Sequence, residues 1–171
     1  PDEKIFKYLK GKPMSPKGDN WEKALSYWNT LKTDSDASFD QEISLNANEI
    51  LPMITWGTSP QDVITIDDRV PNPQSENDED KKNSIERALK YMGLKPDTAA
   101  KDIKIDKVFI GSCTNGRIED LREAAKILKD KKISSHVNAM VVPGSGLVKE
   151  QAEQEGLDKI FVNSGFEWRE P

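Results

Sequence analysis

The sequence predicts an α/β domain in which helices cover a parallel sheet. Three short apolar runs occur in the second half of the chain, at 108–110 (VFI), 138–142 (NAMVV) and 159–163 (KIFVN), and helical patterns separate them. Strands that alternate with helices form βαβ units, whose strands run parallel. The chain has 171 residues, which is enough for one ordinary domain with a sizeable core.

The front part of the chain contains one clear helix. Between residues 20 and 32, Trp21, Trp28 and the apolar residues between them recur at the spacing of one helical face. Asp19 or Asn20 is expected to cap this helix, because their side-chain oxygens accept hydrogen bonds from free N–H groups of the first turn.

The rest of the front part is predicted to be less regular. EISLN at 42–46 and VITI at 63–66 are short strand candidates, and TWGTSPQD is predicted to be a loop. PNPQSENDEDKKN combines prolines with a dense run of charges, which is typical of a surface loop or linker. We therefore expect a single α/β domain over residues 1–171, with a less regular front part at 1–70, a loop or linker at 71–83 and a helix plus a βαβαβ part at 84–171.

Three helices are predicted in the rear part. SIERALKYM at 84–92 has one apolar face and is followed by Gly93, a typical helix stop. The second helix is expected after the loop GSCTN and carries Ile118, Leu121, Ala125 and Leu128. The third is expected at 147–155 and is ended by Gly156.

The composition argues against several classes of protein. The net charge of −5 argues against a nucleic-acid surface, since phosphate binding needs clustered Lys and Arg. No apolar run approaches the roughly 20 residues that span a bilayer, and no secretory signal is visible. A single cysteine forms no internal disulfide, so we expect a reducing, cytoplasmic setting.

The single cysteine, Cys113, lies where a predicted strand ends and a helix begins. Ligands of open parallel sheets gather at this edge, and a helix N-terminus there would favour a thiolate. From its position alone, the thiol is a candidate nucleophile, redox sensor or metal ligand, or only a small residue in a tight turn. A nucleophile needs a base, and nothing in the sequence places the single histidine, His136, near Cys113.

Other residues near the predicted edge are weaker candidates. PGSG at 143–146 is a possible phosphate loop, although a plain strand-to-helix turn explains it more simply. Asn115 is a candidate helix cap, and Arg117 is either a carboxylate-binding residue or a solvated helix residue. Trp56 and Trp168 lie in loops, so we expect them to pack between parts of a larger molecule.

Five motifs resemble one known family of enzymes. They are VFIGSCTNGRIEDLREAA, VVPGSGLVKEQAEQEGLDKIF, GFEWREP, TWGTSPQD and PDEKIFKYLKG. With these motifs the whole chain resembles the large subunit of 3-isopropylmalate dehydratase (isopropylmalate isomerase), in the aconitase superfamily, and in particular its third domain. Trp-Gly-Thr-Ser-Pro and Phe-Glu-Trp-Arg-Glu-Pro favour this branch over aconitase, with homoaconitase as the nearer alternative. The resemblance implies a three-layer αβα fold with a mostly parallel sheet, of the aconitase iron–sulfur domain type.

The resemblance also implies a cofactor. Such enzymes hold a [4Fe–4S] cluster with three cysteines, and Cys113 matches the first of them; Asn115 and Arg117 are weaker candidates for residues that shape the cluster loop. The other two cysteines form a Cys-x-x-Cys pair that begins just beyond the Arg-Glu-Pro matching residues 169–171. We therefore expect this chain to be a fragment of a longer protein, with no catalytic residue of its own. One thiolate is too few to hold the cluster, so we expect the fragment alone to lack it and to be inactive.

The reaction that the resemblance implies is the interconversion of 2-isopropylmalate and 3-isopropylmalate by dehydration and rehydration, a step of leucine biosynthesis. A small subunit or a fused swivelling domain completes the site in such enzymes. Two rivals rest on the residues alone: a stand-alone α/β binding module with a structural Cys113, and a thiol-dependent hydrolase that would need His136 beside Cys113.

Overall fold

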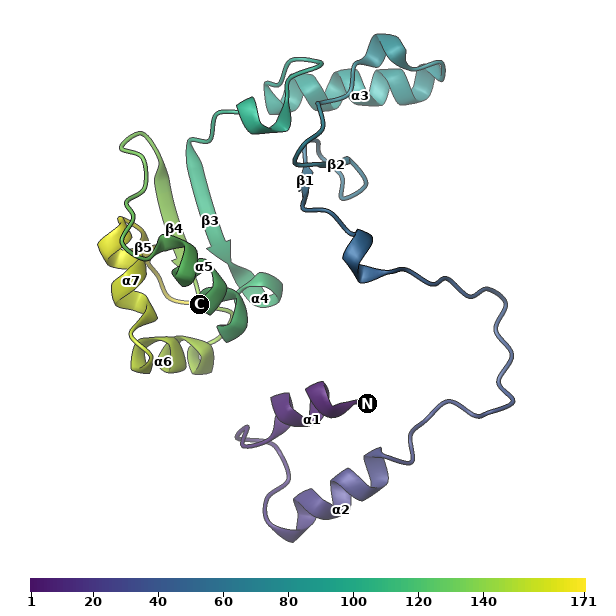
Figure 1. Ribbon diagram of the computed structural model, residues 1–171, viewed down its shortest axis with the longest axis vertical. Helices are drawn as coiled ribbons and strands as arrows, with labels where there is room; N and C mark the ends of the chain where they lie inside the picture. The colour runs from purple at the N-terminus through teal and green to yellow at the C-terminus, as the bar shows by residue number, and fades with distance from the viewer. The chain divides into compact units, whose positions relative to one another are not determined.

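The structure, a computed structural model, describes all 171 residues (Figure 1). The chain divides into two compact units, Pro1–Ile50 and Leu51–Pro171. Each unit is considered by itself below.

The first unit contains two helices, α1 (Glu3–Leu9) and α2 (Asp19–Trp28). α1 was not predicted, although Ile5, Tyr8 and Leu9 follow the i, i+3, i+4 spacing of a helix face. It is capped by Asp2, whose side chain accepts a hydrogen bond from the Ile5 N–H. α2 confirms the predicted helix but is shorter than the predicted range, and its N-cap is Gly18 rather than either expected side-chain cap.

Aromatic side chains hold the first unit together. The Phe6 and Trp28 rings stack at 5.9 Å between centroids, and Trp21 meets Trp28 edge to face at 5.7 Å. Beyond α2, the prediction of a strand at 42–46 is wrong: these residues are irregular and are followed by a short 3₁₀ turn, η1 (Ala47–Glu49). The alternating apolar residues of that stretch stay exposed because no neighbouring strand pairs with them.

The second unit begins with a hairpin of two short strands, β1 (Met53–Thr55) and β2 (Val63–Thr65). β2 was predicted and β1 was not. The loop between them closes on Asp62, whose carboxylate accepts hydrogen bonds from the N–H groups of Thr58 and Ser59.

The hairpin is followed by η2 (Pro73–Ser75), α3 (Glu79–Met92) and η3 (Ala100–Asp102). Trp56 is 5% exposed and packs in a core formed with α3, so the expectation that it packs between parts of a larger molecule is wrong. α3 starts inside the charged segment predicted as a loop, earlier than expected, and ends at Gly93 as predicted.

The early start of α3 is explained by Asp78, whose carboxylate accepts hydrogen bonds from the N–H groups of Asp80 (2.9 Å) and Lys81 (3.0 Å). Replacing Asp78 by alanine leaves these two donors without their partner, so we expect a loss of about 1 kcal/mol in the free energy of unfolding. A urea titration followed by circular dichroism measures this loss. Asp80→Ala is the matched control, and an equal loss in both variants would contradict the capping role.

The rest of the second unit is a parallel sheet with helices. The strands are β3 (Lys107–Gly111), β4 (Asn138–Val142) and β5 (Glu167–Trp168), in the order β3-β4-β5. The helices are α4 (Ser112–Asn115), α5 (Ile118–Leu128), α6 (Gly146–Gln154) and α7 (Leu157–Ser164). The predicted α/β class and parallel sheet are confirmed.

One prediction about the sheet is wrong: KIFVN at 159–163 is helical, and the third strand is β5 instead. Gly156 (φ 73°) and Gly165 (φ 101°) flank this helix, α7, at its two ends. Within it, Leu157 and Phe161 stand four residues apart and are both buried, whereas Val162 is 54% exposed. This is the spacing of a helix face rather than of a strand.

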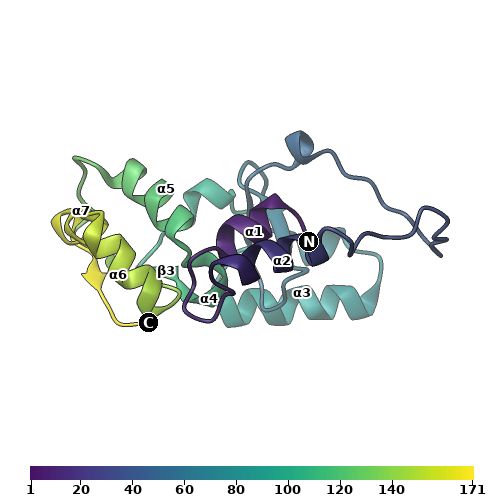
Figure 2. The ribbon, with the colours of Figure 1, turned by 90° about the horizontal axis from the view of Figure 1, so that it is seen from below.

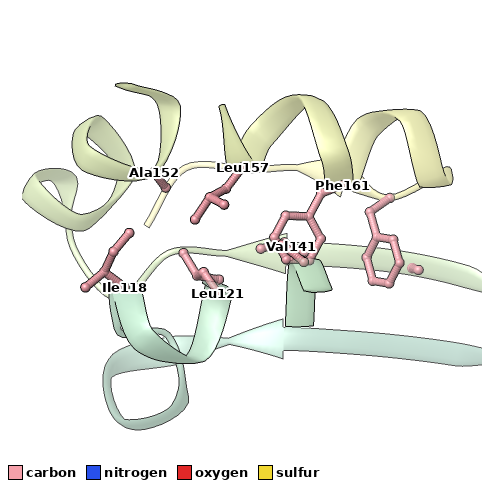
Figure 3. Close-up of a cluster of buried hydrophobic side chains, with 9 residues drawn as sticks. Ile118, Leu121, Val141, Ala152, Leu157 and Phe161 are labelled. Carbon is pink, nitrogen blue, oxygen red and sulfur yellow. The ribbon is translucent and has the colours of Figure 1, made fainter. Parts of the chain in front are cut away.

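The core of the sheet part is formed by α5, α6, α7 and β4, and these helices lie side by side in both ribbon views (Figure 1 and Figure 2). Figure 3 shows Leu121, Val141 and Phe161, which are fully buried in this cluster. Val108 and Ile110 of β3 pack against the same cluster, so the residue between them, Phe109, points to the opposite face, where it is 57% exposed. No helix of the chain combines the length and the apolar character needed to cross a membrane.

Candidate functional site

The carboxyl edge of the sheet brings together segments that are far apart in the sequence. Gly111 of β3 pairs with Val142 of β4, and the N–H of Arg169, just after β5, donates to the carbonyl of Val141. Gly111, Val142 and Arg169 therefore lie at one level across the sheet. Figure 1 shows the arrowheads of β3 and β4 directed toward the end of the sheet where α4 and the C-terminus lie. Two strand spacings separate β3 from β5, which is about 10 Å.

Cys113 lies at this edge, in the single turn of α4. The chain reverses at Gly111 (φ 135°) and Ser112 (φ 74°), and Ser112 is one of few non-glycine residues with a left-handed backbone. The thiol is free and exposed, and its one polar contact is the Thr114 hydroxyl at 3.8 Å. The predicted strand-to-helix position of Cys113 is confirmed: it lies in the short helix α4 directly after β3, and the longer helix α5 begins further along the chain, at Ile118.

Asn115 and Arg117 lie beside the thiol but differ from their predicted roles. α5 is capped at Arg117, whose N–H donates to the Asp120 carboxylate at 3.1 Å. The expectation that Asn115 caps this helix is therefore wrong; Asn115 ends α4 and is exposed. The Arg117 side chain is also exposed and forms no ion pair, so its guanidinium is free to meet an anion.

The PGSG segment is a strand-to-helix turn that abuts the cysteine loop. Ser145 is the N-cap of α6, and its hydroxyl accepts a hydrogen bond from the Val148 N–H at 3.3 Å. The Gly144 N–H donates to the Gly116 carbonyl at 2.8 Å, which joins this turn to the end of α4. The two loops that the sequence singles out separately are thus neighbours in space.

His136 is excluded as a partner of Cys113. It is exposed in the turn before β4, and the first residue of that strand, Asn138, bonds through its N–H to the Asp106 carbonyl before β3. His136 therefore lies at the amino end of the sheet, whereas Cys113 lies at the carboxyl end. Five residues at about 3.3 Å each separate the two ends by roughly 16 Å, so the pairing that a thiol hydrolase needs is absent.

A polar network that sequence reasoning missed ties the residues after β5 to α6. Lys149 contacts the carboxylates of Glu153 (2.8 Å) and Glu170 (3.0 Å), and the Trp168 indole N–H donates to Glu153 at 2.9 Å. Trp168 is half-buried and also stacks on Phe161 of its own unit. The i, i+4 spacing of Lys149 and Glu153 is visible in the sequence and indicates an ion pair on one helix face. Nothing in the sequence indicates that Trp168 and Glu170 join this pair.

These contacts shift the pKa values of Lys149 and Glu153 in opposite directions. Hydrogen bonding to Glu153 and Glu170 raises the pKa of Lys149, and hydrogen bonding from Lys149 and Trp168 lowers the pKa of Glu153. The ion pair of Lys149 with Glu170 ties the chain that leaves β5 to α6.

The residues at the edge fit a metal centre only in part. No group of three or more His, Cys, Asp or Glu side chains is arranged to hold a metal ion. Cys113 offers one exposed thiol, which is a soft ligand of the kind that iron–sulfur clusters use. Cys113 is therefore suited to be one ligand of an iron–sulfur cluster whose other ligands come from elsewhere.

The second unit is thus an α/β domain with a parallel sheet, an accessible thiol and an unpaired arginine at the carboxyl edge of that sheet, which is the edge where ligands of open α/β sheets gather. The sequence matches the aconitase family (aconitate hydratase) over residues 1–171, and the chain belongs to this family. The family consists of hydro-lyase-type enzymes that normally bind a [4Fe–4S] cluster in the intact enzyme.

Proposed function

We propose that this chain is the part of a 3-isopropylmalate dehydratase large subunit that contributes Cys113 to a [4Fe–4S] cluster. The intact enzyme would interconvert 2-isopropylmalate and 3-isopropylmalate in leucine biosynthesis. Membership of the aconitase family supports the reaction class. The motifs TWGTSP and FEWREP support this branch of the family.

The observation that carries the proposal is the common level of Gly111, Val142 and Arg169 at the carboxyl edge. The family resemblance puts the other two thiolates just beyond Arg169–Pro171. β5 runs parallel to β3, so residues that follow it emerge at the same edge as Cys113, about 10 Å away across the sheet. Three thiolates from two loops can then converge on one cluster.

Each residue of the loop has a proposed task. Cys113 supplies one thiolate, and its exposure leaves the sulfur accessible to iron. Arg117, which has no ion-pair partner, is placed to bind a substrate carboxylate, and Asn115 offers an exposed amide beside it. When bound, a cluster with three protein ligands leaves one iron with open positions, which acts as a Lewis acid on a hydroxyl and a carboxylate.

The proposal includes a partner and a compartment. A small subunit or a fused swivelling domain would complete the substrate site, since the edge of this chain offers Arg117 as its one arginine without an ion-pair partner, Arg169 being paired with Glu167. A thiol that must stay reduced to bind iron suits the cytoplasm.

The proposed substrate is tested with the intact enzyme, purified without oxygen and combined with its small subunit. We expect kcat/KM for 2-isopropylmalate to exceed that for homocitrate and for citrate by at least about 100-fold, because an apolar side chain and a carboxylate need opposite surroundings. Formation and loss of the unsaturated intermediate are followed by ultraviolet absorbance. A preference for homocitrate would overturn the assignment in favour of homoaconitase, and a preference for citrate in favour of aconitase.

A further inference from the structure

We propose that Gly116 and Gly144 are positioning residues, which hold the α4 turn and therefore Cys113 in a fixed place against the end of β4. The two residues are named below as the glycine contact. The purpose of this contact rests on the proposed function, whereas its existence and its effect on Cys113 do not.

The backbones of the two glycines meet without room for any side chain. The Gly144 N–H donates to the Gly116 carbonyl at 2.8 Å. A Cβ on Gly144 would lie 2.9 Å from the carbonyl oxygen of Gly116, and a Cβ on Gly116 would lie 2.8 Å from the Gly144 nitrogen and 2.4 Å from the Ser112 carbonyl oxygen. All three obstructing atoms belong to the backbone, so none can rotate away as a side chain would.

Left-handed backbone geometry does not account for these glycines. Neither Gly116 nor Gly144 has a positive φ, unlike Gly111, so both positions admit any residue as far as the backbone is concerned. Close approach of the two loops is the reason for glycine at Gly144, and at Gly116 it acts together with the Ser112 carbonyl of the same turn.

The glycine contact matters because little else holds α4. None of its residues is buried, and the thiol of Cys113 contacts only the neighbouring Thr114 hydroxyl. Ser112, which begins the turn, has a strained φ of 74° that its surroundings have to maintain. Without the contact, this single turn would be free to move on its way from β3 to α5.

A cluster ligand has to be held within about 0.5 Å of its bound position. If the turn that carries it were mobile, binding would have to order the turn, and this would weaken the affinity for the cluster. In the intact enzyme the glycine contact would supply this order in advance. The glycine contact would also fix the position of Cys113 relative to Val142. Val142 of β4 lies level with the end of β5, where the chain leaves the sheet.

The first test uses the unaltered 171-residue chain. The Gly144 amide should exchange with solvent deuterium at least about 100-fold more slowly than the amide of Gly146, because only Gly144 is hydrogen-bonded to a second loop. Equal exchange at the two amides would show that the loops part in solution and would overturn the proposal.

The second test uses a spin label on Cys113, which is the single thiol of the chain. We expect one restricted spectrum for the unaltered chain and a mobile component for Gly116→Ala and Gly144→Ala. Gly146→Ala is the matched control, because a Cβ there meets nothing within 4 Å, and its spectrum should be unchanged. An unchanged spectrum in folded Gly144→Ala would overturn the proposal. If neither variant folds, as judged by circular dichroism, the exchange result decides.

The third test links the contact to iron in the intact large subunit. Gly144→Ala should lower the affinity of the apo-subunit for the cluster by about tenfold or more, as loss of outer-shell support does at other metal sites, while Gly146→Ala should not. Iron per chain during reconstitution is the readout. Unchanged iron uptake in Gly144→Ala, together with a mobile label, would overturn the positioning role. A subunit that never binds iron would instead refute the proposed function and leave the first two results standing.

Discussion

Replacing Cys113 by serine in the intact large subunit should abolish incorporation of the [4Fe–4S] cluster and reduce hydratase activity to background. A serine oxygen is a harder ligand than a thiolate and binds iron–sulfur clusters poorly. The other two thiolates of the proposed site would hold too few irons to retain the cluster. Iron and acid-labile sulfide per chain, with visible absorbance after anaerobic reconstitution, measure the loss.

The same substitution should leave the fold intact, because Cys113 is exposed in a turn with no buried residue. We expect the free energy of unfolding of the 171-residue chain to change by no more than about 0.5 kcal/mol. Thr114→Val is the matched control: it alters the neighbouring exposed residue and should retain a full cluster. Full iron uptake by Cys113→Ser would contradict the ligand role and would favour a structural thiol.

Replacing Phe161 by alanine should lower the free energy of unfolding by about 4 kcal/mol. Phe161 is fully buried, meets Phe166 edge to face at 5.6 Å and stacks on Trp168 at 5.9 Å. Its removal opens a cavity where α7, β4 and β5 meet. Since domains of this size are stable by about 5–15 kcal/mol, the loss removes much of the total.

Urea unfolding followed by tryptophan fluorescence and circular dichroism measures the effect. Val162→Ala is the matched control on the same helix: its side chain is 54% exposed, and we expect a change within about 0.5 kcal/mol. If Phe161→Ala is unfolded in water, Phe161→Leu should show a smaller loss of about 1 kcal/mol. Losses of equal size at positions 161 and 162 would contradict the placement of the core.

Periodicity predicted the elements whose own residues determine them. The helix that carries Ile118, Leu121, Ala125 and Leu128 and the strand at 138–142 are confirmed as α5 and β4, because their apolar spacing extends over the whole element. KIFVN failed because a run of five residues suits a helix or a strand equally well. The two-residue β5 has no pattern of its own and exists only through its pairing with Met140 and Val141.

From the sequence, the candidate site was predicted as two separate loops, and their contact with each other was not predicted. Cys113 and PGSG each stand after a strand, which is enough to assign both to the carboxyl edge of a parallel sheet. The bond between Gly116 and Gly144, and the contacts of Lys149 with Glu153 and Glu170, depend on how two loops and a strand end meet. Such contacts across long sequence separations leave no regular spacing in a single sequence.

The position of β3 at one side of the sheet has a consequence for handling the protein. One row of its backbone N–H and C=O groups faces no neighbouring strand, and Phe109 is largely exposed beside it. An open strand of this kind can template pairing with another molecule, and mutual charge repulsion opposes such self-association. The net charge vanishes near pH 5.1, so we expect concentrated solutions to aggregate there and to stay clear at pH 8.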